Sequence, residues 1–302
     1  MPSGNLTSVA AAAGTAMDMP EQVYKKIAAI AYAQFGVDLR SGRLELVRSR
    51  LAKLLRLQGF SNFSEYLEAV AADKCGKSLI EMMDALTTNH TSFYREKEHF
   101  SFLVEKILPQ LAARPKISIW SAAAATGEEI YTILIVLIEA LKLPFPSPCT
   151  EDRIEVRGTD ISTRALETAR SGVYSDERTD QLPISWRKYF KKGTAAQAGK
   201  VMVRPELRRM AKFERWNLME TPNYNQKYPI IFCRNVLIYF DQPTQEKVVA
   251  RLQCCLEPNG YLFIGHSETL NGVPNGLKYV GPSIYQLVGA ACGVPASMQG
   301  RP

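Results

Sequence analysis

The sequence predicts a doubly wound α/β fold that follows a helical domain and contains a small inserted β subdomain. Three features of the 302-residue chain support this prediction. Residues 20–87 show helical periodicity, short strand-like runs alternate with helical ones from about residue 115, and residues 173–210 interrupt this alternation. Regular alternation of strands and helices implies a parallel sheet covered on both faces.

The N-terminal region is expected to be a basic helical domain. The predicted helices span Glu21–Phe35, Arg43–Leu57, Phe63–Ala71 and Lys77–Leu86. On the second of these, one side of the helix is apolar through Leu44, Val47, Leu51, Leu54 and Leu55. Arg50, Lys53 and Arg56 lie around the other side. A basic helix face is usually just solvated, so this pattern alone leaves its role open.

Residues 88–288 carry the α/β pattern. The expected strands lie at 116–122, 153–160, 212–218, 228–235, 260–268 and 284–289, with helices over 128–143, 162–171 and 242–256. The insertion at 173–210 is expected to be a small antiparallel subdomain. Residues 1–19 are interpreted as a disordered leader and residues 289–302 as a flexible tail.

Composition excludes several classes of protein. Hydrophobic residues make up 46% and charged residues 22% of the chain, which is ordinary for a globular protein. No run approaches the roughly 18 apolar residues of a membrane helix, and the N-terminus lacks the features of a secretory signal. The six cysteines form no CxxC pair and the three histidines do not cluster with them, so neither a metal site nor a disulfide framework is expected. A reducing cytoplasm is the expected compartment.

The net charge of +7 suggests an acidic partner. Nucleic acid, anionic lipid and an acidic protein surface all satisfy this requirement, and composition does not choose among them.

The turn after the first strand favours a ligand without phosphates. Ser121 to Gly127 is a run of small residues, which lets a ligand approach the backbone at the end of a strand. It contains one glycine, and Glu128 and Glu129 would repel a pyrophosphate at the helix start. These features argue against NAD or FAD and for S-adenosylmethionine, whose cationic part suits a carboxylate. The two glutamates could equally serve the helix dipole alone.

Later strand ends supply further candidate ligands. Asp160 closes the second strand, where an acidic residue commonly binds a ribose diol, although a helix N-cap is an alternative role. Asn217 and Leu218 follow the next strand and could hold an adenine. The segment from Asn89 to Glu96 combines polar, cationic and aromatic residues and could close a site from above or simply link two domains.

Taken together, these segments resemble the CheR family of chemotaxis receptor glutamate O-methyltransferases, from about residue 20 to residue 288. The matching strings are TTNHTSFYREKEHF, WSAAAATGEEIY, RGTDIS, ARSGVY, RWNL, FCRNVLIYFD and LFIGHSE. Three residues depart from the family pattern. Ala125 replaces a frequent Ser, Ile130 a usual Pro, and His90 a common Glu.

The resemblance implies a doubly wound S-adenosylmethionine-dependent methyltransferase sheet with an N-terminal helical domain and an inserted β subdomain. It implies a cofactor site formed by Asn89, Thr91, Arg95, Ala122, Glu128, Asp160, Asn217, Leu218, Arg234 and Asn235. It also implies that Arg95 and Tyr239 act near the reacting carboxylate, and that Arg50, Lys53 and Arg56 grip the receptor. The cofactor would be S-adenosylmethionine with no metal.

The expected reaction is methyl esterification of glutamate side chains on the cytoplasmic helical bundle of chemotaxis receptors. Some family members also bind a receptor C-terminal peptide at the β subdomain, and the loop 193–199 permits this without requiring it. Three alternatives are less favoured. The Pro-Pro-aromatic signature of nucleobase amino-methyltransferases is missing, Arg95 and Tyr239 argue against a non-catalytic cofactor sensor, and the glycine-poor turn argues against an oxidoreductase. Neither nucleic acid binding nor membrane insertion is expected.

Overall fold

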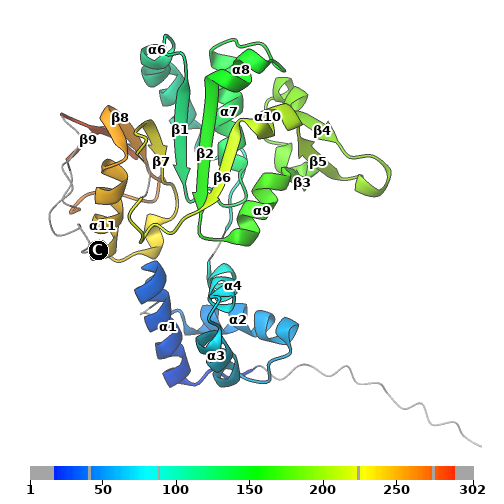
Figure 1. The fold of residues 1–302 in the computed structure, drawn as a ribbon, viewed down its shortest axis with the longest axis vertical. Coiled ribbons are helices and arrows are strands. Elements are labelled where there is room, and N and C mark those ends of the chain that lie inside the picture. Colours follow the sequence, from blue (N-terminus) through cyan, green and yellow to red (C-terminus); the bar gives the residue numbers. More distant parts are fainter. Residues whose placement is uncertain (1–16, 40–41, 88, 223–224, 274–275, 290–302) are drawn as a thin grey trace, which may run out of the picture.

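The computed structural model describes residues 17–39, 42–87, 89–222, 225–273 and 276–289 (Figure 1). Most of the predicted leader and tail lies outside these residues. Four helices come first along the chain, and a mixed sheet flanked by helices follows. The N-terminal helices are α1 (Glu21–Phe35), α2 (Leu44–Gln58), α3 (Phe63–Ala72) and α4 (Lys77–Leu86).

The boundaries of these helices follow from local sequence. α1 and α2 end at Gly36 and Gly59, which adopt φ angles of 70° and 80°. Only glycine reaches this left-handed region without steric cost, and it is the common helix C-cap. The apolar side of α2 is buried through Val47, Leu51 and Leu55. On the other side of the helix, Lys53 and Arg56 are exposed and Arg50 is half-buried.

Seven strands form the main sheet, in the order β6-β2-β1-β7-β8-β10-β9. Their bounds are β1 Ile117–Ala122, β2 Ile154–Asp160, β6 Ala211–Arg215, β7 Tyr228–Phe232, β8 Leu256–Phe263, β9 Leu277–Gly281 and β10 Ile284–Leu287. β1 pairs in parallel with both β2 and β7. The chain therefore builds outward on one side of β1 and then crosses to the other. Ligands of doubly wound sheets bind at such a switch point.

The far edge of the sheet departs from the purely parallel prediction. β10 is antiparallel to both β8 and β9. Only two residues, Pro282 and Ser283, separate β9 from β10. A connection this short can form a hairpin, whereas a parallel crossover needs a dozen or more residues. β9 has no counterpart among the strands predicted from the sequence.

Helices cover both faces of the sheet. One face packs against α7 (Glu128–Ala140) and the helical segment formed by α5 (Lys97–Phe102), a π-helical turn (Leu103–Ile107) and α6 (Leu108–Leu111). The other packs against α11 (Gln242–Gln253), and its apolar core continues into the helical domain. α9 (Thr163–Ser171) follows β2, and Ser162 caps it by accepting a hydrogen bond from the Ala165 amide. α8 (Pro148–Arg153) precedes β2.

The 173–210 segment forms a separate three-stranded antiparallel sheet. Its strands are β3 (Val173–Ser175), β4 (Phe190–Lys192) and β5 (Lys200–Val203), in the order β3-β5-β4, and α10 (Pro205–Arg209) leads back to the main sheet. Figure 1 shows it projecting beside α9, away from the helical domain. Short 3-10 turns at Asp176–Thr179, Ile184–Tyr189 and Ala195–Gln197 connect its strands.

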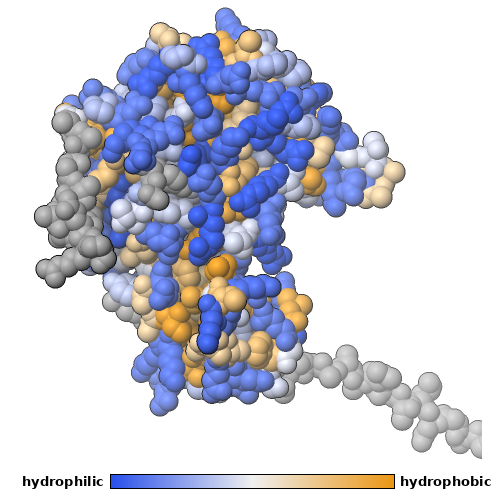
Figure 2. Space-filling model, viewed as in Figure 1, coloured by the Kyte–Doolittle hydropathy of each residue, from blue (hydrophilic) through white to orange (hydrophobic). Residues whose placement is uncertain are grey.

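The visible surface reflects this division. Figure 2 shows a largely hydrophilic face on the α/β domain, with apolar atoms reaching the surface near the junction with the helical domain. Among the described residues, none of the helices has the length and apolar character needed to cross a bilayer.

Candidate functional site

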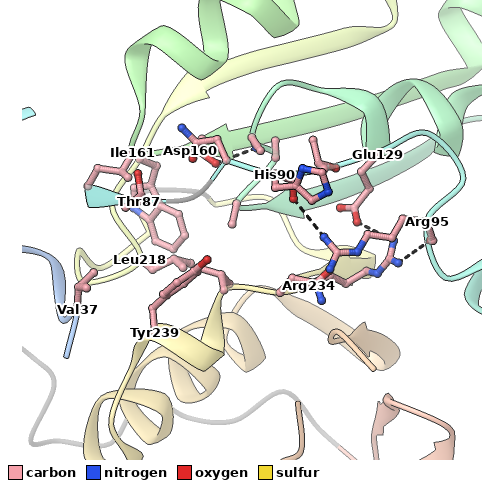
Figure 3. A pocket seen from close by; sticks show the side chains of 18 of the residues that line it. Val37, Thr87, His90, Arg95, Glu129, Asp160, Ile161, Leu218, Arg234 and Tyr239 are labelled. Carbon is pink, nitrogen blue, oxygen red and sulfur yellow. Dashed lines mark hydrogen bonds and ion pairs between the residues drawn. The ribbon is translucent and has the colours of Figure 1, made fainter. Parts of the chain in front are cut away.

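A pocket lies at the carboxyl ends of β1, β2, β6 and β7, beside the helical domain (Figure 3). Small residues of the β1–α7 turn, Ala123 to Ala125, form part of its wall. Phe35, Val37 and Met83 reach it from the helical domain, and residues 89–92, 94 and 95 line it between the two domains. The pocket therefore occupies the switch point of the sheet, where the topology places a ligand.

The pocket brings together residues from six separate segments of the chain. Of the ten residues predicted to bind the cofactor, eight line it: Asn89, Thr91, Arg95, Asp160, Asn217, Leu218, Arg234 and Asn235. Tyr239 lines it too, and Figure 3 shows its ring directed into the space shared with Leu218 and Asp160.

Two predicted ligands lie elsewhere. Ala122 is a fully buried core residue at the end of β1, and the lining begins at the next residue. Glu128 is fully buried, and its carboxylate contacts Arg178 of the β subdomain and the Thr126 hydroxyl. The neighbouring Glu129 lines the pocket instead. Consecutive helical residues point about 100° apart, so packing decides which glutamate of the pair faces the ligand.

Glu129 belongs to a buried network around Arg234. The Arg234 guanidinium donates to Glu129 Oε2 at 2.8 Å, to Glu96 Oε2 at 2.9 and 3.2 Å, and to the Arg95 carbonyl at 2.6 Å. Its side chain is only 3% exposed. Four of the five guanidinium N–H groups are thus directed to protein oxygens. Arg234 therefore organises the pocket wall, with one N–H left for a ligand.

Glu96 was not singled out by the sequence patterns, although it ends the FYRE string. Besides Arg234, it accepts a hydrogen bond from Asn235 Nδ2 at 3.2 Å. Burial alone would raise the pKa of Glu96, but the charge and hydrogen bonds of Arg234 hold it below the ordinary value. Glu96 is therefore a carboxylate that connects the 89–96 segment to the end of β7.

Asp160 is held in a defined orientation at the end of β2. Its Oδ2 accepts the Ala125 amide at 2.8 Å and its Oδ1 accepts the Ser162 amide at 2.9 Å. Burial raises the pKa of Asp160, and these two hydrogen bonds oppose that rise. A buried carboxylate fixed by two backbone amides at a strand end matches the group that binds a ribose diol in doubly wound folds. The sequence left a capping role open, and Ser162 performs it instead.

Asn217 and Asn89 also make contacts within the protein. The Asn217 side chain donates to the Gln34 carbonyl at 2.8 Å and accepts the Met219 amide at 3.0 Å. It thereby ties the end of α1 to the pocket. Asn89 donates to the Ser162 hydroxyl at 3.3 Å. The sequence patterns did not predict the contact between Asn217 and Gln34, because it depends on how the helical domain packs.

The aromatic residues of the 89–96 segment anchor it to the β subdomain. Phe93 packs edge-on against Tyr174 and Phe190, with ring centroids 5.1 and 5.4 Å apart. Tyr94 packs against Trp186 at 5.0 Å, and its backbone adopts a positive φ of 56°. Such a conformation is costly for a bulky residue and persists only where surrounding contacts impose it. These contacts fix the middle of the 89–96 segment against the β subdomain.

The GHSE string supports the loop after β7. Glu268 is buried and accepts backbone amides from Asn235 at 2.9 Å, Ile238 at 3.2 Å and Gly265. Burial raises the pKa of Glu268, against the effect of these bonds. Asn235 adopts a positive φ of 59°, and a side chain at Gly265 would collide with it. Glu268 therefore fixes the turn that carries Asn235 and Tyr239.

The three departures from the family pattern have definite places. Ala125 has a φ of 46° and donates its amide to Asp160. Ile130 is fully buried, and its Cδ1 lies directly over Gly158 of β2, so a side chain at position 158 would have to displace it. His90 lines the pocket, and its carbonyl accepts a hydrogen bond from Arg95 at 3.2 Å.

The basic residues of α2 lie on a groove at the domain junction. Arg50 and Lys53 line it together with Arg164 of α9. Arg56 is exposed on the next turn of α2, outside the lining of this groove. Arg50 also donates to the carbonyl of Leu86 at the end of α4, so part of its role is internal. The contribution of Arg164 was not predicted, because it comes from a distant part of the sequence.

Comparison with known proteins agrees with this geometry. The family model for the CheR methyltransferase SAM-binding domain matches residues 89–285, and the model for the CheR methyltransferase all-alpha domain matches residues 22–87. The chain is 40% identical over 256 residues to chemotaxis protein methyltransferase 2 of Pseudomonas aeruginosa, covering 84% of this chain and 89% of that protein.

Two further relatives extend the match. The chemotaxis protein methyltransferase of Borreliella burgdorferi is 38% identical over 265 residues, which covers 85% of this chain and 91% of the relative. That of Salmonella typhimurium is 36% identical over 290 residues, which covers 95% of this chain and 97% of the relative. The chain therefore belongs to the CheR methyltransferase family and carries both its all-alpha domain and its S-adenosylmethionine-binding domain.

Proposed function

We propose that this protein transfers a methyl group from S-adenosylmethionine to glutamate side chains on the cytoplasmic helical bundle of chemotaxis receptors. The observation that carries the proposal is the pocket itself, which is bordered by Asp160 at one strand end and by Arg95 and Tyr239 beside it. The names of the relatives support the chemotaxis assignment.

The pocket residues fit the proposed cofactor. The fixed carboxylate of Asp160 suits a ribose diol, the small residues Ala123 to Ala125 permit close approach, and Leu218 with Asn217 offers a surface for an adenine. The carboxylate of Glu129 and the remaining N–H of Arg234 suit the charged amino-acid portion. When bound, S-adenosylmethionine supplies a methyl group activated by a sulfonium.

Methyl transfer to a glutamate carboxylate does not require the protein to move a proton. A glutamate carboxylate has an ordinary pKa of about 4.3, so it is already ionised near neutral pH and needs no general base. It needs alignment with the methyl group and loss of its hydrating water. Arg95 and Tyr239 border the pocket with polar groups that can orient two carboxylate oxygens. Strong pairing would restrain the nucleophile, so we assign both residues to alignment.

The basic groove supports an acidic helical partner. Lys53 and Arg164 line the groove beside Ala85 of α4, and Arg56 is exposed on the next turn of α2. Clustered exposed cations raise the encounter rate with an acidic surface and set its register. We assign Lys53 and Arg56 mainly to docking and give Arg50 a further role in holding α4.

The deciding experiment is methyl transfer from radiolabelled S-adenosylmethionine to membranes that contain the organism's chemotaxis receptors. The label should enter receptor protein and be released as volatile methanol by mild alkali, because carboxyl methyl esters hydrolyse in base. Receptors with the modified glutamates replaced by alanine serve as the control. Alkali-stable label, or label in added RNA instead of receptor, would assign a different acceptor.

A further inference from the structure

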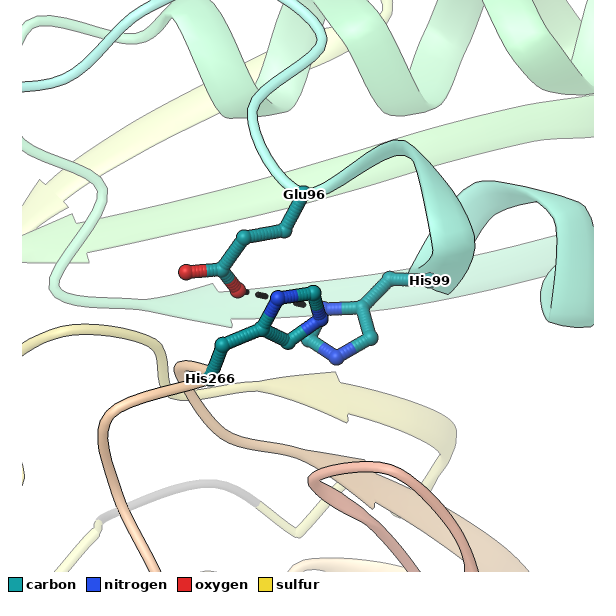
Figure 4. A group of neighbouring side chains, drawn as sticks. All are labelled: Glu96, His99 and His266. Atoms are coloured by element: carbon teal, nitrogen blue, oxygen red, sulfur yellow. Dashed lines mark ion pairs between the residues drawn. The ribbon is translucent and has the colours of Figure 1, made fainter.

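A second cluster of functional side chains lies behind the pocket wall. Glu96, His99 and His266 each offer one potential ligand atom, and these atoms all lie within 4.8 Å of one another (Figure 4). Glu96 precedes α5, His99 lies in its first turn, and His266 follows β8. The sequence suggested no metal site, because His266 is separated by well over a hundred residues from the other two and no cysteine accompanies them.

His99 carries the strongest indication of a ligand. Its side chain is 1% exposed, and its Nε2 lies 3.3 Å from the Pro282 carbonyl. A carbonyl only accepts, so Nε2 carries the hydrogen and Nδ1 of the neutral ring presents a lone pair. That buried Nδ1 has no hydrogen-bond partner among the described residues.

The Nδ1 atom of His99, which carries no hydrogen, lies close to a carboxylate oxygen of Glu96. His99 Nδ1 lies 3.5 Å from Glu96 Oε2, so a lone pair and a carboxylate oxygen oppose each other without a hydrogen between them. A cation between the two atoms would relieve that repulsion. Zinc–nitrogen and zinc–oxygen bonds of about 2.0–2.2 Å in a tetrahedron place neighbouring ligand atoms about 3.3–3.5 Å apart. The observed separation matches this spacing.

The hydrogen bonds that His99 and Glu96 make to other residues resemble those that orient the ligands of a metal ion. Metal-binding histidines usually donate the other ring nitrogen to a carbonyl or carboxylate, as His99 does toward Pro282. Metal-binding carboxylates are likewise hydrogen-bonded, as Glu96 is by Arg234 and Asn235. The exposed ring of His266 lies edge-on to His99 at 4.7 Å and can turn toward the same point.

We propose that Glu96, His99 and His266 form a binding site for a divalent transition metal, with Zn²⁺ as the best match. Two imidazoles and one carboxylate are a donor set that zinc favours, and three protein ligands leave a further coordination position. His266 is on the surface, so that position faces solvent and the ion can exchange.

The proposed metal site is connected to the cofactor pocket through Glu96. Glu96 holds Arg234 and Asn235, and both line that pocket. A bound dication would draw negative charge of Glu96 away from them and loosen this wall. Zinc should therefore weaken S-adenosylmethionine binding, and by linkage the cofactor should weaken zinc binding by the same factor.

The test is titration of the full-length protein with Co²⁺, whose visible absorption bands report coordination by protein ligands. Cys75 and Cys149 are exposed, so both are first replaced by serine to remove competing thiols. One equivalent of Co²⁺ should bind, and Zn²⁺ should displace it. H266Q should weaken binding beyond the roughly 10- to 100-fold loss that follows removal of an outer-shell partner. H90Q, which removes the chain's remaining histidine, is the matched control and should bind normally.

Binding of less than one equivalent of Co²⁺, or equal Co²⁺ affinities in H266Q and wild type, would refute the proposed metal site. Because His266 is exposed, H266Q should fold normally, which circular dichroism will verify. Calorimetric titration of S-adenosylmethionine with and without Zn²⁺ tests the influence on the pocket separately. An equal effect of zinc in wild type and H266Q would refute that influence. Neither measurement depends on identifying the methyl acceptor, so failure here is distinct from failure of the proposed function.

Discussion

Arg234→Met should destabilise the protein far more than removal of a similar arginine at the surface. The guanidinium of Arg234 pairs with both Glu96 and Glu129 and is 3% exposed. Its loss leaves Glu129 without its cation and leaves Glu96 with only the more distant and more exposed Arg95, at 3.8 Å. Removing one partner of a buried ion pair typically costs about 3–5 kcal/mol. We therefore expect the free energy of unfolding to fall by about that amount.

Arg209→Met provides the control. Arg209 makes a two-pronged contact with Glu151 at 2.7 and 2.8 Å, but its side chain is 57% exposed. An exposed pair of this kind contributes about 0–1 kcal/mol. Urea unfolding of both variants, followed by circular dichroism and tryptophan fluorescence, measures the difference. Equal losses in the two variants, or a loss below about 1 kcal/mol for Arg234→Met, would show that burial does not set the strength of this network.

The pH dependence provides an independent check. The folded-state pKa of Glu96 is lowered, so its contribution to stability is present above the unfolded pKa of about 4.3 and is lost as the pH falls through the folded value. In Arg234→Met, Glu96 loses its closest cation and keeps only Arg95 at 3.8 Å, so its pKa should rise relative to wild type and it should take up a proton at higher pH. The difference in the free energy of unfolding between wild type and variant should therefore become smaller as the pH falls from 7 toward 4. If this difference instead becomes larger as the pH falls, Glu96 and Arg234 are not the charged pair assigned here.

Three further predictions concern the cofactor and the receptor. Asp160→Asn should weaken S-adenosylmethionine binding by about 1.5–3 kcal/mol, the range for a hydrogen bond to a charged group, and unchanged affinity by calorimetry would remove Asp160 from the site. Arg95→Ala and Tyr239→Phe should lower kcat much more than receptor affinity, whereas equal losses would assign them to binding. Reversing Lys53 and Arg56 to glutamate should abolish receptor methylation at low salt while cofactor binding persists; wild-type rates in this double variant would place docking elsewhere.

The sequence alone determined the elements whose signals are local. Helical periodicity, the capping glycines Gly36 and Gly59, and the apolar runs of the central strands each act within a few residues. The positions of Asp160 and Arg234 at strand ends followed as well, because parallel strands bring their carboxyl ends to one edge. Eight residues that line the pocket could therefore be placed together from their order along the chain and from family resemblance.

Tertiary packing decided what local pattern could not. Glu128 and Glu129 are adjacent and chemically identical, and only the position of Arg178 and Arg234 in space directs one to the β subdomain and the other to the pocket. His266 meets His99 because β8 ends beside α5, a proximity that no short-range spacing encodes. Side-chain direction, burial and charge pairing depend on neighbours distant in sequence, and these decide which polar residues bind a ligand and which hold the fold.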